Sequence, residues 1–298
     1  MNHSLFEEHT KMLVNILDKS SLDLKEKKYR KENLLKIYNQ MVETNSINSR
    51  YYNLSHEIRS LDFLNNYGCL VIASDSKSEK GCDFYLDSGI QIECVCSSRG
   101  DEKKNGLDQF NGNGVFDYNV KEGIILSRLT QSINEKVLFY QNHILDKSIN
   151  PNKPYIIFLG LGNLTYGMIN EKFGFTLNKI LFGVGHIRLH LNLETNSYVK
   201  QDYTYNRIIK KHNNADINCN LFASSDYNCV SAIIYTTANL DERYTTDNTF
   251  LFINPTAVNK IRANKFSNMI YWRKNKRGEY IPRSHGKDMN HHFIRKWY

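Results

Sequence analysis

The sequence predicts a mixed α/β (α+β) protein in which helices flank a central mixed sheet. Apolar residues recur at three- and four-residue spacing over residues 5–45 and 126–144, which indicates helices. Between and after these segments lie short apolar runs bounded by Gly, Ser, Asp or Asn, which indicates strands. The chain is 41% hydrophobic and 12% aromatic, so it can bury a sizeable core and wholesale disorder is excluded.

Several protein classes are excluded by the same composition. No stretch approaches the roughly 18 consecutive apolar residues of a membrane span, and the N-terminus lacks the pattern of a signal peptide. We therefore expect no membrane association and a cytoplasmic location. The six cysteines lie mostly in apolar runs, and Cys94-Val-Cys96 is too tight for a usual zinc knuckle, so we expect reduced, buried thiols.

The positive charge of the chain is concentrated in its tail. The formal net charge is +8, and residues 260–298 alone hold 11 basic and two acidic side chains. A near-neutral body with a basic tail predicts one surface for an anionic partner. We divide the chain into a helical N-terminal extension (1–50), a core (51–160), a β-rich extension of that core (161–259) and a basic aromatic tail (260–298), without a linker between them.

The first half of the chain predicts an ordered series of elements. Residues 5–45 are helical, and their charge run at 25–28 is typical of a solvated face. A helix capped by Asn53 and ended by Gly68 follows. Strands are predicted over 69–73, 83–87 and 90–96, the last two forming an antiparallel hairpin around Ser88-Gly89.

A long polar segment, residues 97–123, separates this hairpin from the next helix. It is rich in Gly and Asn and exceeds the roughly 12–15 residues of an ordinary structureless loop, which is typical of functional or disordered loops. A helix over 126–144 and a buried strand over 154–159 come next. Further strands are predicted over 180–183, 186–191, 230–235 and 250–254, in the same sheet or packed beside it.

Three acids stand among apolar neighbours. Glu57 lies on the first core helix, Asp83 opens the second strand, and Glu93 lies inside the third. Period-two alternation places Gln91, Glu93 and Val95 on one face. Carboxylates brought together in an apolar setting repel each other unless a cation binds them, and Mg²⁺ prefers such oxygen ligands.

These residues and their order resemble the PD-(D/E)xK, or restriction-endonuclease-like, nuclease superfamily. Its core is helix–three strands–helix–strand with an acid on the first helix, and the resemblance covers about residues 54–265. The local sequence is most similar to a branch of bacterial proteins with an Ile-Glu-Ala-Val-type third strand. The matching pieces are Glu57, Cys82-Asp83-Phe84, Ile92-Glu93-Cys94-Val95, residues 127–136, Pro154-Tyr155 and Asn254-Pro255-Thr256-Ala257.

The resemblance implies metal-assisted hydrolysis of phosphodiester bonds, in DNA more than in RNA. Asp83, Glu93 and the carbonyl of Cys94 would hold Mg²⁺, or Mn²⁺ as a substitute, with Glu57 helping directly or through water. Val95 stands where the superfamily has its catalytic lysine. Lys136, or Arg128 on the same helix, is the expected replacement, while Arg128 and Gln131 would contact the scissile phosphate.

Each of these residues also has a structural interpretation. Asp83 can be a turn residue, Glu57 a first-turn acid favoured by the helix dipole, and Lys136 a surface lysine paired with Glu135 or another acid. Glu93 can be a strand carboxylate satisfied by Arg128. The order of all four on the expected elements favours the site.

The tail interleaves aromatic and basic residues, which suits phosphate contacts and base stacking. Its candidate substrate-binding residues are Arg273, Lys274, Lys276 and Arg277. A final hairpin that packs its aromatics inward is the structural alternative. Two other functions remain open, a nucleic-acid-binding protein that has lost catalysis and an interaction or effector domain on the same scaffold, and a homodimer is compatible with either.

Overall fold

The computed structural model describes residues 3–46, 48–73, 81–97, 122–162, 174–195, 197–210, 215–240, 242–262, 266, 269–274, 280–284 and 287–288. Its α-helices are α1 (His3–Lys19), α2 (Leu24–Thr44), α3 (Ser49–Asn66), α5 (Glu122–Leu145) and α6 (Phe175–Phe182). Its strands are β1 (Val71–Ala73), β2 (Phe84–Leu86), β3 (Gln91–Cys96), β4 (Tyr155–Gly160), β5 (Val184–Asn192), β6 (Ser197–Tyr205), β7 (Ile208–Lys210), β8 (Asp216–Asn218), β9 (Val230–Thr236), β10 (Thr249–Ile253), β11 (Ile270–Lys274), β12 (Tyr280–Ser284) and β13 (Lys287–Asp288).

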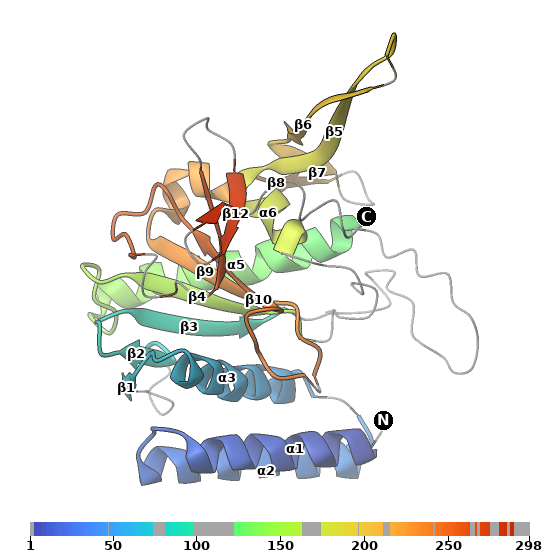
Figure 1. Ribbon diagram of the computed structural model, residues 1–298. Coiled ribbons are helices and arrows are strands. Elements are labelled where there is room, and N and C mark those ends of the chain that lie inside the picture. The colour runs from blue at the N-terminus through green and yellow to red at the C-terminus, as the bar shows by residue number, and fades with distance from the viewer. Residues whose placement is uncertain are drawn as a thin grey trace.

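A nine-stranded mixed sheet forms the centre of the molecule (Figure 1). Its strand order is β1-β2-β3-β4-β9-β10-β11-β12-β13. The first three strands are antiparallel, β3, β4 and β9 are parallel, and β10 returns antiparallel to β9. Strand β11 runs parallel to β10, and β12 and β13 continue antiparallel. This arrangement confirms the predicted α+β class with a central mixed sheet.

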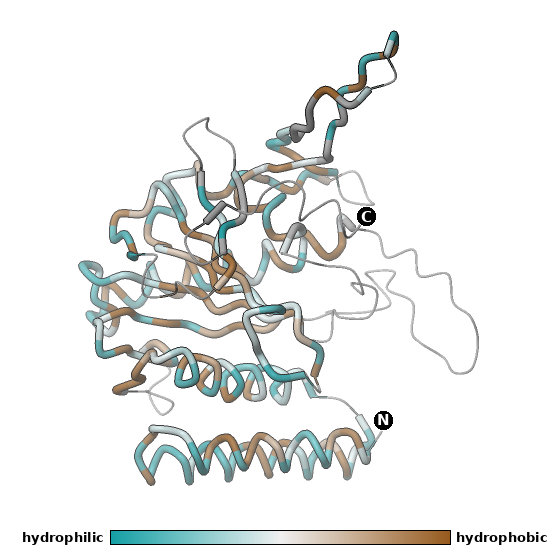
Figure 2. Tube along the Cα trace, viewed as in Figure 1, coloured by the Kyte–Doolittle hydropathy of each residue, from teal (hydrophilic) through white to brown (hydrophobic). Residues whose placement is uncertain are grey.

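Helices cover both faces of this sheet. Helix α3 packs on one face, and the α1–α2 hairpin packs on the outer side of α3, whereas α5 lies across the opposite face (Figure 1). One buried cluster joins all three N-terminal helices to the sheet, for example Leu17, Leu34 and Phe158. A second joins α5 and α6 to the other face. Apolar residues accordingly follow the central strands and alternate with polar ones along the helices (Figure 2).

The N-terminal segment is helical as predicted, and the prediction was wrong about the residue that caps α3. Residues 5–45 form a helical hairpin, because the chain turns at Ser20–Asp23 and the Asp23 side chain caps the new helix by accepting from the Glu26 N–H. Helix α3 begins at Ser49 with Asn48 as its cap, so Asn53 is not the cap. Gly68, at φ 71°, follows the end of α3 as predicted.

The predicted hairpin and its flanking elements are confirmed. Strands β2 and β3 pair antiparallel around a tight turn in which Gly89 has φ 77°, a conformation that favours glycine. Helix α5 begins four residues earlier than predicted, at Glu122, and β4 follows it. Most of the predicted loop over 97–123 lies outside the described residues.

The second half of the chain contains one wrong prediction. Residues 180–183 are not a strand, because Ile180–Phe182 close the short helix α6, where Ile180, Leu181 and Phe182 are buried. Strands β9 and β10 enter the central sheet, whereas β5–β6 and β7–β8 form separate two-stranded sheets. The β5–β6 ribbon projects from the body (Figure 1).

The described part of the tail completes the sheet. Strands β11 and β12 pair antiparallel, with Trp272 and Tyr271 buried and Arg273 exposed. This is the hairpin with inward aromatics that the sequence offered as the structural alternative. Among the described residues, none of the helices has both the length and the apolar character needed to cross a bilayer.

Candidate functional site

The candidate site lies where β2 and β3 separate. Strand β2 begins at Phe84, so the portion of β3 beyond Glu93 has no strand partner on that side. Side chains take over the hydrogen bonds there. The Cys94 N–H donates to Asp83 Oδ2 (2.7 Å), and the Cys96 N–H donates to Asn53 Oδ1 (3.3 Å). An unpaired backbone edge inside the protein thus becomes a polar recess that holds Asp83.

Glu93 faces α5 and meets Lys136. Lys136 Nζ donates to Glu93 Oε1 at 2.6 Å, and the other carboxylate oxygen accepts from the Asp83 N–H at 3.3 Å. The Glu93 side chain is only 6% exposed and that of Lys136 is 21% exposed. The structure therefore brings Glu93, Asp83 and Lys136 together, and the lysine comes from the second core helix, as the sequence led us to expect. Val95 lies on the same face of β3, where it packs against the apolar cluster beneath α5.

Burial raises the pKa of both strand acids, and the charge of Glu57 adds to the rise in each. For Asp83, burial is the larger cause, and the charges of Glu93 and Glu57 add to it. For Glu93, burial outweighs the opposing effect of Lys136, so the pKa rises although the acid has a cationic partner. For Lys136, burial alone would lower the pKa, but Glu93 and Asp83 overcome it and the pKa is raised. Lys136 is therefore an ammonium group at neutral pH.

Glu57 reaches the same region from α3 and is held by an arginine from α2. Arg30 Nη1 donates to Glu57 Oε2 and Arg30 Nε donates to Glu26 Oε1, both at 2.7 Å. The guanidinium carbon lies 5.4 Å from the centre of the Phe84 ring, next to Asp83. Burial would lower the pKa of Arg30, but Glu57, Glu26 and Asp83 outweigh it and the pKa is raised.

The donor set fits one hard divalent cation. Asp83 and Glu93 supply carboxylates, and the Cys94 carbonyl points toward the same recess as its N–H, because both groups of an extended residue face one neighbour. Within the described part of the chain, no three His, Cys, Asp or Glu side chains converge as an all-side-chain metal site. Mg²⁺ does not require one, since it typically combines one or two carboxylates with waters and substrate oxygens.

Nucleophilic cysteine chemistry does not fit this region. Cys82 and Cys94 are buried, and burial together with the neighbouring acids raises the pKa of both thiols. A thiol whose pKa is raised stays protonated at neutral pH and is a poor nucleophile.

The two polar residues predicted on α5 lie outside the acidic recess. Arg128 donates to Gln131 at 3.3 Å, and Gln131 donates to Glu135 at 3.0 Å. Arg128 is eight residues before Lys136, or roughly 12 Å along the helix. Glu93 is therefore paired with Lys136 and not with Arg128.

Arg273, on the described part of the tail, is remote from the recess. Arg273 lies on β11, four strands from β3, which corresponds to roughly 19 Å. Strand register places Glu93 in one row with Ile157, Ile233, Phe252 and Trp272, so Arg273 is in the adjacent row and faces the other side of the sheet. Lys274 ends β11, and Lys276 and Arg277 lie outside the described residues.

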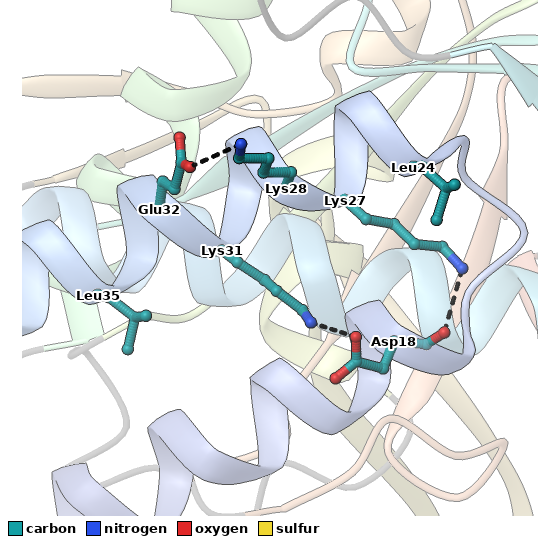
Figure 3. A pocket seen from close by; sticks show the side chains of 7 residues that line it. All are labelled: Asp18, Leu24, Lys27, Lys28, Lys31, Glu32 and Leu35. Atoms are coloured by element: carbon teal, nitrogen blue, oxygen red, sulfur yellow. Dashed lines mark hydrogen bonds and ion pairs between the residues drawn. The ribbon is translucent and has the colours of Figure 1, made fainter.

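A surface hollow of about 340 Å³ lies at the α1–α2 hairpin (Figure 3). Lys27 donates to the Asp18 carbonyl at 3.1 Å, Lys31 pairs with the Asp18 carboxylate, and Lys28 lies 3.9 Å from Glu32. Because each of these lysines already has a hydrogen-bond or ion-pair partner, the hollow is a solvated, internally paired face, as predicted for Lys27 and Lys28.

Sequence reasoning missed Arg30 and Glu26. The charge run at 25–28 is expected to be solvated, but Glu26 is buried at 8% exposure and accepts a hydrogen bond from Arg30 Nε. A signal was present, because Glu26, Arg30 and Leu34 recur every four residues on the stripe of α2 that also contains Met41. A charged pair inside an apolar stripe indicates burial against a partner.

Comparison with known proteins gives no relative for this chain: no protein-family model, no curated protein and no solved structure matches it.

Proposed function

We propose that this protein is a divalent-metal-dependent phosphodiesterase that cleaves nucleic acid in the cytoplasm, DNA more than RNA. The single observation that carries the proposal is the contact of Lys136 on α5 with Glu93 on β3, beside Asp83 just before β2. A lysine and two carboxylates form the minimal set of the PD-(D/E)xK superfamily, and here α5 provides the lysine that β3 lacks. The preference for DNA follows from that resemblance.

Asp83, Glu93 and the Cys94 carbonyl would hold Mg²⁺ or Mn²⁺. When bound, such an ion lowers the pKa of a coordinated water and stabilises charge on the phosphate. The raised pKa values of the two acids fit this role, because a cation favours the ionised form that burial penalises.

Lys136 contributes charge and orientation and does not take up a proton. Its raised pKa keeps Nζ protonated, so it can donate hydrogen bonds but cannot act as a general base at neutral pH. With one hydrogen bond to Glu93, the ammonium group has two further donors for a phosphate oxygen or for the attacking water.

The test is cleavage of plasmid, single-stranded DNA and RNA by the purified full-length chain in Mg²⁺, Mn²⁺ or EDTA. We expect metal-dependent cleavage that Glu93→Gln and Lys136→Met both abolish. Glu135→Gln is the matched control, because Glu135 is exposed and adjacent to Lys136 on α5. Cleavage that survives Glu93→Gln would show that another site or a contaminant is responsible.

A binding function without catalysis is the second candidate, and Val95 is the observation that favours it. With an apolar residue at the motif position, Lys136 and Glu93 can serve as a mutually satisfied ion pair. In that case the protein would bind DNA in a salt-sensitive manner, and neither metal would produce cleavage.

A further inference from the structure

Tyr155 connects the first position of β4 to the turn of α5 that carries Lys136. Its side chain is fully buried, and its hydroxyl donates to the Lys136 carbonyl at 3.1 Å. Its ring packs against that of Tyr140, with the ring centres 4.7 Å apart, and Tyr140 lies about one helical turn beyond Lys136. Burial raises the pKa of the Tyr155 phenol, so the hydroxyl stays protonated at neutral pH and is the donor. Tyr155 therefore meets α5 at the backbone of the candidate site lysine.

Two hydrogen bonds hold the two ends of Lys136. Strand register pairs Tyr155 with Gln91, so Tyr155 lies two residues, or roughly 7 Å, before Glu93 along the sheet and faces the same side. The Lys136 backbone is thus fixed at one row of the sheet. Its ammonium group reaches the next row, where it donates to Glu93 Oε1 at 2.6 Å. A displacement of α5 along the sheet would therefore separate Nζ from Glu93.

Core packing alone does not require the Tyr155 hydroxyl. Helix α5 already packs on the sheet through apolar side chains such as Leu129, Ile133 and Val137. The Lys136 carbonyl lies inside this helix, where the N–H four residues further on is its regular partner. A phenylalanine would fill the same space without a hydroxyl that has to be desolvated and satisfied. The hydroxyl adds direction, because a hydrogen bond specifies one position of α5 relative to β4 and apolar contacts are not directional.

We propose that Tyr155 is a positioning residue whose hydroxyl holds α5 in the register at which the Lys136 ammonium group meets Glu93 beside Asp83. The consequence for catalysis rests on the proposed function. The consequence for the contact between Lys136 and Glu93 does not, so it can be measured without any nucleic acid.

The test measures how fast an amine-reactive acetylating reagent modifies Lys136 in the metal-free full-length protein, followed by mass spectrometry. In the wild type the reaction should be slow, because Nζ is paired with Glu93 and the Lys136 side chain is only 21% exposed. In Tyr155→Phe we expect it to be about fivefold faster relative to the exposed Lys28, as for a contact that loses the support of one ordinary hydrogen bond. The pKa of Nζ, obtained from the pH dependence of the rate, should fall toward its ordinary value, because burial lowers it and the charges of Glu93 and Asp83 keep it raised.

Tyr227→Phe is the matched control. The Tyr227 hydroxyl also donates to α5, to the side-chain oxygen of Asn134 at 2.6 Å. This variant therefore removes a tyrosine hydrogen bond two residues from Lys136 and leaves the bond from Tyr155 in place. We expect both variants to lower the urea midpoint, and only Tyr155→Phe to change the acetylation of Lys136. An equal rise in the control would indicate general loosening of α5 and overturn the inference, as would a Tyr155→Phe rate within twofold of the wild type.

Cleavage assays separate this inference from the proposed function. If the wild type cleaves nucleic acid, Tyr155→Phe should lower kcat by about the same factor and leave KM unchanged, because Tyr155 is buried and cannot touch the substrate. An unchanged kcat would refute the catalytic consequence. Faster acetylation of Lys136 without cleavage of any nucleic acid by the wild type would refute the phosphodiesterase and support the role of Tyr155 in holding the contact with Glu93.

Discussion

Replacing Asp83 with asparagine should make the metal-free protein more stable. Asp83 is half-buried in the recess, and desolvation together with the charges of Glu93 and Glu57 raises its pKa, so the ionised form carries a free-energy cost. The amide in Asp83→Asn removes the charge and keeps an oxygen that can accept from the Cys94 N–H, now at 2.7 Å from Oδ2. The variant therefore removes the free-energy cost of the Asp83 charge and keeps the hydrogen bond from the Cys94 N–H.

The size of the gain follows from how such charges behave. Each unit by which the native pKa exceeds the unfolded one destabilises the protein by about 1.4 kcal/mol at pH values above both. Relief of buried, poorly compensated charge typically stabilises by about 1–3 kcal/mol. For a chain of this size that corresponds to roughly 2–4 °C in Tm per kcal/mol. The assay is thermal unfolding at pH 7.5 in EDTA and again in Mg²⁺.

The matched control is Asp87→Asn, on the same hairpin but exposed, which should leave Tm unchanged. In Mg²⁺ the wild type should have the higher Tm of the two, because the wild type gains stability from the ion and Asp83→Asn does not. A lower Tm for Asp83→Asn in EDTA would refute the reasoning, since it would make the Asp83 carboxylate a stabilising structural group.

Three further predictions address other parts of the molecule. Lys136→Met should lower the free energy of unfolding by about 1–3 kcal/mol, because Glu93 loses its partner inside the protein, and urea unfolding beside the Glu135→Gln control measures this. Acid should destabilise the protein through His9 and His56, which are buried and neutral, His56 between Tyr244 Oη (2.6 Å) and the Phe158 carbonyl (2.8 Å). Burial lowers the pKa of both histidines to about 3. Their contribution to the free energy of unfolding is therefore complete above pH 6.5, and each histidine loses about 1.4 kcal/mol of it per pH unit as the pH drops toward 3. Asp83 and Glu93 have raised pKa values, so they make the protein more stable as the pH falls and oppose the effect of the histidines. If the urea midpoint of the wild type does not fall between pH 7.5 and 5, or falls equally in His56→Gln, the histidines are not the cause of acid destabilisation. Arg273→Gln should reduce the slope of log affinity for DNA against log salt by about one if Arg273 contacts a phosphate, and an unchanged slope would remove it from the interface.

The sequence was informative where local pattern and chemistry agree. The β2–β3 hairpin followed from alternation and a Gly turn. Lys136 was a candidate only through the family resemblance, with Arg128 as the alternative, and the structure places Lys136 on Glu93. The strand predicted over residues 180–183 was wrong because a short apolar run is equally compatible with a strand and with the end of a buried helix.

Arg30 could not be placed from local pattern alone. Its partner Glu57 lies 27 residues further along the chain, on α3, beyond the end of α2 at Thr44. Only the packing of the hairpin against α3 decides which acid it meets. The same holds for Asn53, expected as a helix cap and found to accept from the Cys96 N–H.

The separation of the site residues along the chain also has a consequence for synthesis on the ribosome. Asp83 and Glu93 leave the exit tunnel on one hairpin, after Arg30 but well before Lys136. Glu93 therefore cannot be buried with its partner until α5 has emerged, and the hairpin must stay hydrated until then. Translation thus sets an order of assembly in which the arginine side of the recess is available first and the lysine closes it last.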